Sequence, residues 1–465
     1  MSLIIRLSMG WGVGTGLLSI LFFFWMTIFQ SSSLLPMVEA AVTLALGIFY
    51  FRSRGKWAPL PGAHSPATQE SRAITLFAGV VSLFLLASAV YVFLVNLAIL
   101  PHGRWDAWMI WSLRAKALSY FHDDWRMAFD PSYGWTHAGY PLLLPASMAR
   151  VAIHYNLSGC LPMKVFEPII PAITSFLFTF SVPALVFSFI FHLRGAALAL
   201  AASAMLLSAQ MICLQGSSLY ADLPLAFYML AAVGLAAIAM EGKKENGRTW
   251  ALAGFCAGLA AWTKNEGMLF VLALIWAVVC ASWLKGGFRR ALPRLGMLAL
   301  GLAPPVFTII AFKIAIPAHN YLISANTVEM ILAKALDPDR YLFILFGMVY
   351  EIFHYGGVIF AGYTLPAPAL ALMFLAAWGT RERALRQEPV MMIMLSLTAM
   401  LIGYTAVYII TPMGLQYQFT TSVARLITQV WPIFVMLVTL AARHGDGEGS
   451  AAAFTELADN GGEDG

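Results

Sequence analysis

The sequence predicts an all-α, polytopic membrane protein, a bundle of about twelve transmembrane helices. Hydrophobic residues make up 60% of the 465 residues, against about 45–50% in an ordinary soluble domain, and the mean hydropathy is +0.77. Several apolar runs, among them residues 73–100, exceed the ~18–20 residues needed to cross a bilayer. Helices are expected because lipid offers backbone amides no partner outside their own segment.

The formal charge of +5 does not indicate a nucleic-acid-binding surface. Most basic residues lie in short loops between apolar runs, which is typical of the cytoplasmic loops of membrane proteins. These loops are FRSRGK (51–56), HLRG (192–195), EGKKENGR (241–248), KGGFRR (285–290) and RERALR (381–386). We therefore expect membrane lipids and no nucleic acid among the partners.

Placing the basic loops inside orders the membrane spans along the chain. A retained first helix at about 9–30 and a second at 35–51 are followed by a span at 73–100 and a long outer segment, 101–164. The next span is expected at 165–191, and two more run from residue 196 out to QGSSLYAD (215–222) and back to EGKKENGR. A short pair is expected at 249–263 and 267–284, followed by single spans at 295–316 and 358–380. A final pair of spans flanks the outer loop TPMGLQYQFTTSVAR (411–425). Residues 317–357 are expected to hold polar turns and an interfacial helix.

This order divides the chain into three parts. Residues 1–72 form an N-terminal helix pair with a cytoplasmic loop, and residues 73–443 form the main transmembrane module. The acidic tail, 444–465, is expected to be disordered in the cytoplasm because it has little apolar surface to bury.

Every conspicuous polar cluster outside the basic loops falls on the outer face in this topology. The clusters are HGRWDAW (102–108), WTHAGYP (135–141), SSLYAD (217–222), TKNEG (263–267) and LQYQFTTSVAR (415–425). Convergence of separate loops at one face is how a membrane enzyme would build an active site.

The first cluster sets one carboxylate, Asp106, among tryptophans. On a helix turning about 100° per residue, Trp108 and Trp111 fall opposite Asp106, while Arg114 and Lys116 flank it. This predicts an interfacial helix with its indoles among lipid headgroups and its carboxylate facing a polar region. The alternative is an aromatic-belt anchor in which Asp106 only caps the helix and pairs with arginine.

Three further clusters carry charge near the outer surface. Lys264 and Glu266 follow a helix too short to span comfortably, so they are expected below the surface, where charge costs a few kcal/mol and is rarely idle. Lysine suits an anionic group such as phosphate, although the two side chains could simply satisfy each other. Asp222 could be a second acid or a helix N-cap, and Arg425 could bind phosphate or snorkel.

The pattern of possible metal ligands is weak. Four histidines lie in or next to the outer segment without HxxxH or HExxH spacing, and four cysteines show no ligand spacing. The residues are His102, His122, His137, His154, Cys160, Cys213, Cys256 and Cys280. We expect no metal site and no required cofactor; a divalent metal is not supported by this spacing.

The motifs WDAW, YPLLLP, YADLPL and AWTKNEG, in this order, resemble those of the GT-C glycosyltransferases, in particular the bacterial branch related to protein O-mannosyltransferases and the lipid A aminoarabinose transferase. The resemblance covers about 75–440. It implies a GT-C fold whose first large periplasmic loop contains interfacial helices, a catalytic Asp106, a second acid at Asp222, and Lys264 against a polyprenyl phosphate. The chain departs from the family at Ala138-Gly139, where an acid is expected, and we do not expect the large C-terminal periplasmic domain that many relatives have.

The reaction implied is sugar transfer from a polyprenyl-monophosphate donor to a hydroxyl of a lipid, glycan or protein acceptor, outside a bacterial inner membrane. Such a reaction needs a general base and several cations. It needs no nucleotide-binding loop, and the sequence contains no motif typical of such a loop. The expected residues are Asp106 and Asp222 for catalysis, Lys264, Arg104, Arg114, Lys116 and Arg425 for the donor phosphate, and Trp105, His137, Tyr140 and Glu266 for substrate. The competing functions are a transporter or flippase of lipid-linked sugars, and a non-catalytic membrane protein.

Overall fold

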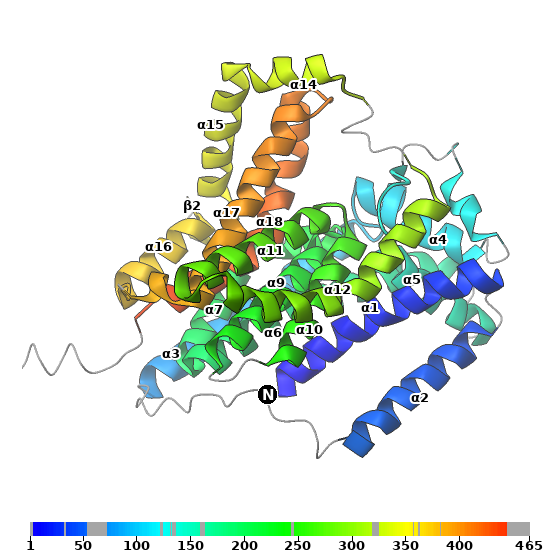
Figure 1. Cartoon of the computed structure of the whole chain (residues 1–465), viewed down its shortest axis with the longest axis horizontal. Helices are drawn as coiled ribbons and strands as arrows, with labels where there is room; N and C mark the ends of the chain where they lie inside the picture. The colour runs from blue at the N-terminus through cyan, green and yellow to red at the C-terminus, as the bar shows by residue number, and fades with distance from the viewer. Residues whose placement is uncertain are drawn as a thin grey trace, which may run out of the picture.

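The computed structural model is a bundle of helices (Figure 1) and describes residues 3–31, 34–53, 72–120, 124–130, 132, 136–158, 163–242, 246–318, 325–356, 358–360, 363–381 and 383–443. The predicted cytoplasmic loop at 54–71, His122, Cys160 and the acidic tail lie outside these residues. Eight helices among the described residues are long and apolar enough to cross a membrane. They are α1 (Leu3–Phe29), α3 (Arg72–Ile99), α6 (Met163–Arg194), α9 (Asp222–Glu241), α11 (Glu266–Gly286), α12 (Phe288–Ala315), α17 (Glu388–Ile410) and α18 (Leu415–Ala441). The chain is therefore a multi-pass helical membrane protein.

Helix α9 forms the centre of the bundle. Every residue from Asp222 to Met240 is buried, and α6, α10 (Gly247–Thr263), α17 and α18 all pack against it. Between Asp222 and Glu241 at its two ends, the sequence of α9 is apolar on all sides, which is typical of a helix with no solvent-exposed face. Helix α1 also belongs to this core, because the Tyr228 hydroxyl donates to the Gly12 carbonyl at 2.7 Å.

Two segments differ from the predicted spans. The span expected from residue 196 is broken at Ala209 into α7 (Ala196–Ser208) and α8 (Gln210–Ser217), since Ala209 has an extended backbone with ψ of 92°. The span expected at 358–380 is replaced by a hairpin, β1 (Val358–Phe360) with β2 (Tyr363–Leu365), and by the twelve-residue α16 (Ala367–Trp378). Twelve helical residues measure only ~18 Å, less than the bilayer core.

The described residues of the region expected to hold one interfacial helix, 325–356, contain two helices. Helix α14 (Val328–Ala335) lies across the top of Figure 1 at the end of α17, and helix α15 (Pro338–His354) follows it. Helix α15 returns alongside α17 and α18. At the opposite edge, α2 (Leu35–Ser53) makes few contacts with the bundle and exposes most of its apolar side chains.

The outer segment folds into short helices over one end of the bundle. They are η1 (Ala107–Trp111), α4 (Ser112–Tyr120), η2 (Trp125–Phe129) and α5 (Leu143–Ser158). The predicted place of Trp111 among lipid headgroups is wrong, because its side chain is 0% exposed and packs on Tyr140 at 5.3 Å between ring centroids. Residues 107–111 form a π-helical turn, which rotates less per residue than an α-helix and so turns Trp111 inward. Trp105 and Trp108 are exposed.

Candidate functional site

Five charged residues form one continuous chain of ion pairs at the end of the bundle where α9 and α11 begin, and its one residue from α18, Arg425, lies about three turns into that helix. The Arg425 guanidinium joins two carboxylates, Asp106 at 2.7 Å and Asp222 at 3.0 Å. Lys264 also joins two, Asp222 at 3.0 Å and Glu266 at 2.7 Å. We call this Asp106–Arg425–Asp222–Lys264–Glu266 series the charged chain. It unites all three acids and two of the five cations expected at the site.

Asp222 lies at the buried centre of the charged chain. It is the first residue of α9, and Ala221 before it occupies the N-cap position, so Asp222 is not the N-cap. Its carboxylate instead accepts hydrogen bonds from Lys264, Arg425 and, at 2.5 Å, the Gln429 amide. The Tyr404 hydroxyl donates to the side-chain oxygen of Gln429 at 2.7 Å. Asp222 is 0% exposed, and these donors compensate for its lost hydration.

Lys264 is positioned by the tight turn between α10 and α11. Its own backbone is extended and ends α10, while Glu266 begins α11 two residues later. The turn brings α11 against the last residues of α10, and a Cβ at Gly267 would collide with the Ala260 backbone. The ion pair between Lys264 and Glu266 is present, as expected if the two side chains satisfy each other. Lys264 also pairs with Asp222, however.

The chain segment just before Asp106 packs against the turn between α8 and α9. The Arg104 amide donates to the Ser218 carbonyl at 3.2 Å. Gly103 has a positive φ of 72°, and a Cβ on this residue would lie only 2.5 Å from the Ser218 carbonyl oxygen. The Asp106 side chain makes no cap hydrogen bond among the described residues. Its carboxylate pairs with Arg425, and 21% of the side-chain surface remains exposed, so a substrate could also contact it.

His137 and Tyr140 lie beside the charged chain without bonding to it. Burial lowers the pKa of His137, with the nearby Arg114, Lys264 and Arg425 adding to the effect and Asp106 opposing it. Burial also raises the pKa of Tyr140 to about 12, so the phenol stays protonated at neutral pH. His137 has a positive φ of 51°, a conformation that non-glycine residues seldom adopt and that recurs at functional sites.

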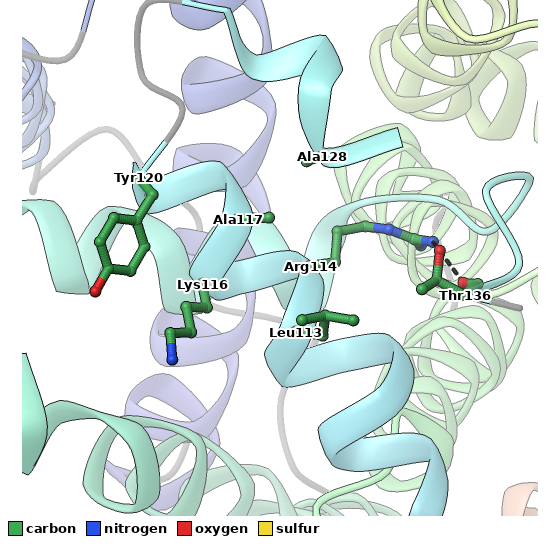
Figure 2. Close-up of a pocket in the computed structure, with 7 residues that line it drawn as sticks. All are labelled: Leu113, Arg114, Lys116, Ala117, Tyr120, Ala128 and Thr136. Carbon is green, nitrogen blue, oxygen red and sulfur yellow. Dashed lines mark hydrogen bonds between the residues drawn. The ribbon is translucent and has the colours of Figure 1, made fainter. Parts of the chain in front are cut away.

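The other predicted cations lie apart from the charged chain. Arg114 is 1% exposed and its Nη2 donates to the Thr136 carbonyl at 2.5 Å and to the Thr136 hydroxyl at 3.2 Å. Figure 2 shows that the Lys116 ammonium points away from this guanidinium. Arg104 and Trp105 are exposed on the surface next to Asp106.

Four residues at or near the site were not predicted from the sequence: Gln429, Tyr404, Tyr220 and Lys313. The Arg425 guanidinium lies over the Tyr220 ring at 4.4 Å, and Lys313 donates to the Gly139 carbonyl. A polar residue in an apolar helix was the available signal for Gln429 and Lys313, because such residues in membrane helices face a partner or a cavity.

The fold and the charged chain define a multi-pass helical membrane protein with a buried polar site at one end of its bundle. Among the described residues, no group of three or more His, Cys, Asp or Glu side chains is close enough to hold a metal ion. Comparisons with protein-family models, with curated proteins and with solved structures each gave no match.

Proposed function

We propose that the protein is a membrane glycosyltransferase of the GT-C type with about twelve spans. It would move a sugar from a polyprenyl monophosphate to a lipid, glycan or protein hydroxyl at the outer face of a bacterial inner membrane. The observation that supports this most is the charged chain, in which five separate side chains from four segments meet at one end of the bundle. Buried charges cost several kcal/mol each, so their concentration here favours a functional role over packing.

The exposed fractions of the three carboxylates suggest their roles. Asp222 is 0% exposed and its oxygens are taken by three donors, whereas Asp106 is 21% exposed. Asp106 is therefore our general base, and Asp222 is a positioning residue that fixes Arg425 and Lys264. Glu266, with 22% exposure, is left to contact substrate.

The transfer step needs one base. The acceptor hydroxyl oxygen bonds to the anomeric carbon of the sugar, the bond from that carbon to the phosphate oxygen breaks, and the hydroxyl proton passes to the Asp106 carboxylate. The polyprenyl phosphate leaves with the electron pair of the broken bond. Its charge is stabilised by cations rather than by a general acid, because a phosphate is already a good leaving group.

The test is Asp106→Asn in purified protein supplied with a radiolabelled polyprenyl-phosphate sugar and native membranes as the source of acceptors. We expect transfer to fall about 10²- to 10⁴-fold, the usual contribution of a positioned base. Asp130→Asn is the matched control, since Asp130 is an exposed aspartate of the same outer segment that bonds only locally, to the Ser132 amide at 2.8 Å. Transfer that persists in Asp106→Asn would reject the base assignment.

Transport of a lipid-linked sugar is the second candidate. It is favoured by the full burial of Asp222 and the near-full burial of Lys264 between helices, since charges inside membrane bundles also mark transport pathways. Reconstituted vesicles separate the two functions: a transferase makes a glycosylated product, whereas a flippase moves the intact donor between leaflets without breaking it.

A further inference from the structure

The turn between α11 and α12 carries more positive charge than its neighbours neutralise. Lys285, Arg289, Arg290 and Arg294 lie in this turn and the first two turns of α12. Among the described residues, the carboxylate that pairs with them is Glu388, at the start of α17. Both of its oxygens are engaged, one by Arg290 at 3.0 Å and the other by the buried Arg294. Four cations against one carboxylate leave three positive charges in excess (4 − 1 = 3).

Lys285 and Arg289 are the two cations that this carboxylate does not neutralise. Both side chains are exposed, and neither forms an ion pair within the described part of the chain. Arg289 also lies in the first turn of α12, where the helix dipole disfavours a cation and where there is no acidic residue to offset it. These two charges add no ion pair to the fold, and they are accessible to an anion from outside.

Exposed apolar side chains lead away from this turn along both helices. On α11, Leu272, Trp276 and Trp283 are exposed and recur at helical spacing. On α12, Phe288 and Leu292 are exposed one turn apart. Each of these two stripes begins within two residues of a basic side chain. The surface is therefore cationic at one end and apolar along its length.

The backbone leaves open space along the same surface. Gly287, between the two helices, has a positive φ of 78°, and a Cβ built on it would meet nothing within 4 Å. Gly296 continues the Phe288–Leu292 stripe at the same four-residue spacing, and a Cβ there would also meet open space. A headgroup can approach the turn closely, and a hydrocarbon chain can lie against α12 beside Gly296.

We propose that this surface binds an anionic diacyl phospholipid in the membrane leaflet at this end of the bundle. Lys285 and Arg289 contact the headgroup phosphate, while the exposed stripes of α11 and α12 contact the acyl chains. A phospholipid carries its charge at one end of its hydrocarbon chains and so matches both parts of the surface. A soluble phosphate covers only the basic part, and a zwitterionic lipid adds an ammonium group that the excess positive charge repels.

This site is separate from the charged chain, which lies at the other end of α11. Lipid binding here does not depend on whether the protein transfers or transports a sugar.

The experiment measures lipid binding to the full-length protein in detergent by native mass spectrometry. The probes are phosphatidylglycerol, phosphatidylethanolamine with the same acyl chains, and glycerol 3-phosphate as a soluble phosphate. We expect phosphatidylglycerol to bind most tightly. The double variant Lys285→Gln with Arg289→Gln should weaken its binding about 30-fold, because each cation near an anionic lipid contributes about fivefold. Binding of phosphatidylethanolamine should stay unchanged in the same variant.

The matched control is the double variant Arg52→Gln with Arg72→Gln. These two arginines are exposed at the end of α2 and the start of α3, so the control removes the same charge from another part of the chain and should leave phosphatidylglycerol binding unchanged. Trp283→Ala tests the apolar part of the surface. It should weaken both phospholipids, since it removes a contact with acyl chains and no charge.

Four results would each overturn the proposal. They are unchanged phosphatidylglycerol binding in a folded Lys285→Gln, Arg289→Gln variant, an equal loss in the control variant, phosphatidylethanolamine binding as tight as that of phosphatidylglycerol, and displacement of phosphatidylglycerol by equimolar glycerol 3-phosphate. If the double variant fails to fold, Lys285→Gln and Arg289→Gln alone carry the same test, with an expected loss of about fivefold each.

Discussion

Asp106 and Asp222 share one arginine, yet they should respond differently to the same substitution. Asp222→Asn removes a fully buried charge that holds Arg425, Lys264 and Gln429, and breaking a buried pair costs about 3–5 kcal/mol. We expect a clearly lower melting temperature for Asp222→Asn in detergent, measured by intrinsic fluorescence. Asp106→Asn, at a partly exposed position, should change it by little. Equal melting temperatures of the two variants would contradict the central role given to Asp222.

His137 gives the site a pH dependence whose sign follows from its surroundings. Because burial and nearby cations lower its pKa in the folded state, the unfolded chain binds a proton more readily than the folded chain. Stability is therefore fully present above pH ~6.5, the ordinary histidine value, and is lost as pH falls toward the lowered pKa. The effect should be small because the side chain is partly exposed.

The melting temperature measured between pH 5 and 7.5 should fall on acidification by less in His137→Asn than in wild type. Asparagine is the suitable replacement because it tolerates the positive φ of 51° at this position. Identical pH profiles for the two proteins would show that His137 does not contribute.

At the scale of elements, the position of Lys264 depends on how closely α10 packs against α12. A Gly254-x-x-x-Gly258 pair on α10 faces α12, where a Cβ at Gly254 would lie 2.8 Å from the Leu298 carbonyl carbon. Such pairs of small residues let membrane helices approach backbone to backbone. The contact fixes α10, and so fixes the turn that carries Lys264 at its end.

Gly254→Ala should therefore destabilise the protein by about 1–3 kcal/mol through overpacking. Gly296→Ala on α12 is the control, because a Cβ there meets open space and alanine is the better helix former by about 0.5–1 kcal/mol. Melting temperatures of the two variants should move in opposite directions. An unchanged melting temperature in Gly254→Ala would mean that α10 and α12 can move apart without loss of stability.

The helices themselves were largely predictable from the sequence, because hydrophobic length records membrane burial directly. The short pair at 249–263 and 267–284 appears as α10 and α11 with nearly the same bounds. The break at Ala209 and the π-helical turn at 107–111 were missed because both depend on tertiary packing and leave no mark on hydropathy. For the same reason, the prediction that assumed a regular α-helix from Asp106 onward placed Trp111 on the wrong face.

The membership of the site was partly predictable, but its pairings were not. Asp106, Asp222, Lys264, Glu266 and Arg425 stood out because charge is rare in an apolar chain. Which carboxylate meets which cation depends on contacts between residues up to 319 positions apart, since 425 − 106 = 319, as in the pair of Arg425 with Asp106. The isolation of Arg114 from any carboxylate among the described residues is a property of the fold alone.

At the scale of the whole molecule, charge collects at both ends of the bundle. Opposite the charged chain, Glu388 pairs with Arg290 at 3.0 Å and with Arg294, where α12 and α17 begin. The two clusters are separated by the length of α11, whose 21 residues span ~30 Å, the thickness of a bilayer core. The basic loop at 285–290 lies at the second end, as do residues 381 and 383–386.

This arrangement predicts opposite sidedness for two surface positions in a variant without native cysteines. His102→Cys, next to the charged chain, should react with a membrane-impermeant maleimide on intact spheroplasts, and Leu385→Cys should react only after lysis. Both residues are exposed. Labelling of His102→Cys only after lysis would place the charged chain in the cytoplasm and remove the basis for an outer active site.

The burial of α9 from Asp222 to Met240 limits how the protein can move. A helix enclosed on every side has no room to tilt or slide unless its neighbours separate first, so Asp222, at its first residue, is a stationary anchor. Any opening that admits a long-chain lipid must come from lightly held parts at the periphery. Arg425 bonds both to this anchor and to the partly exposed Asp106, and it is the link that such an opening would stretch or release.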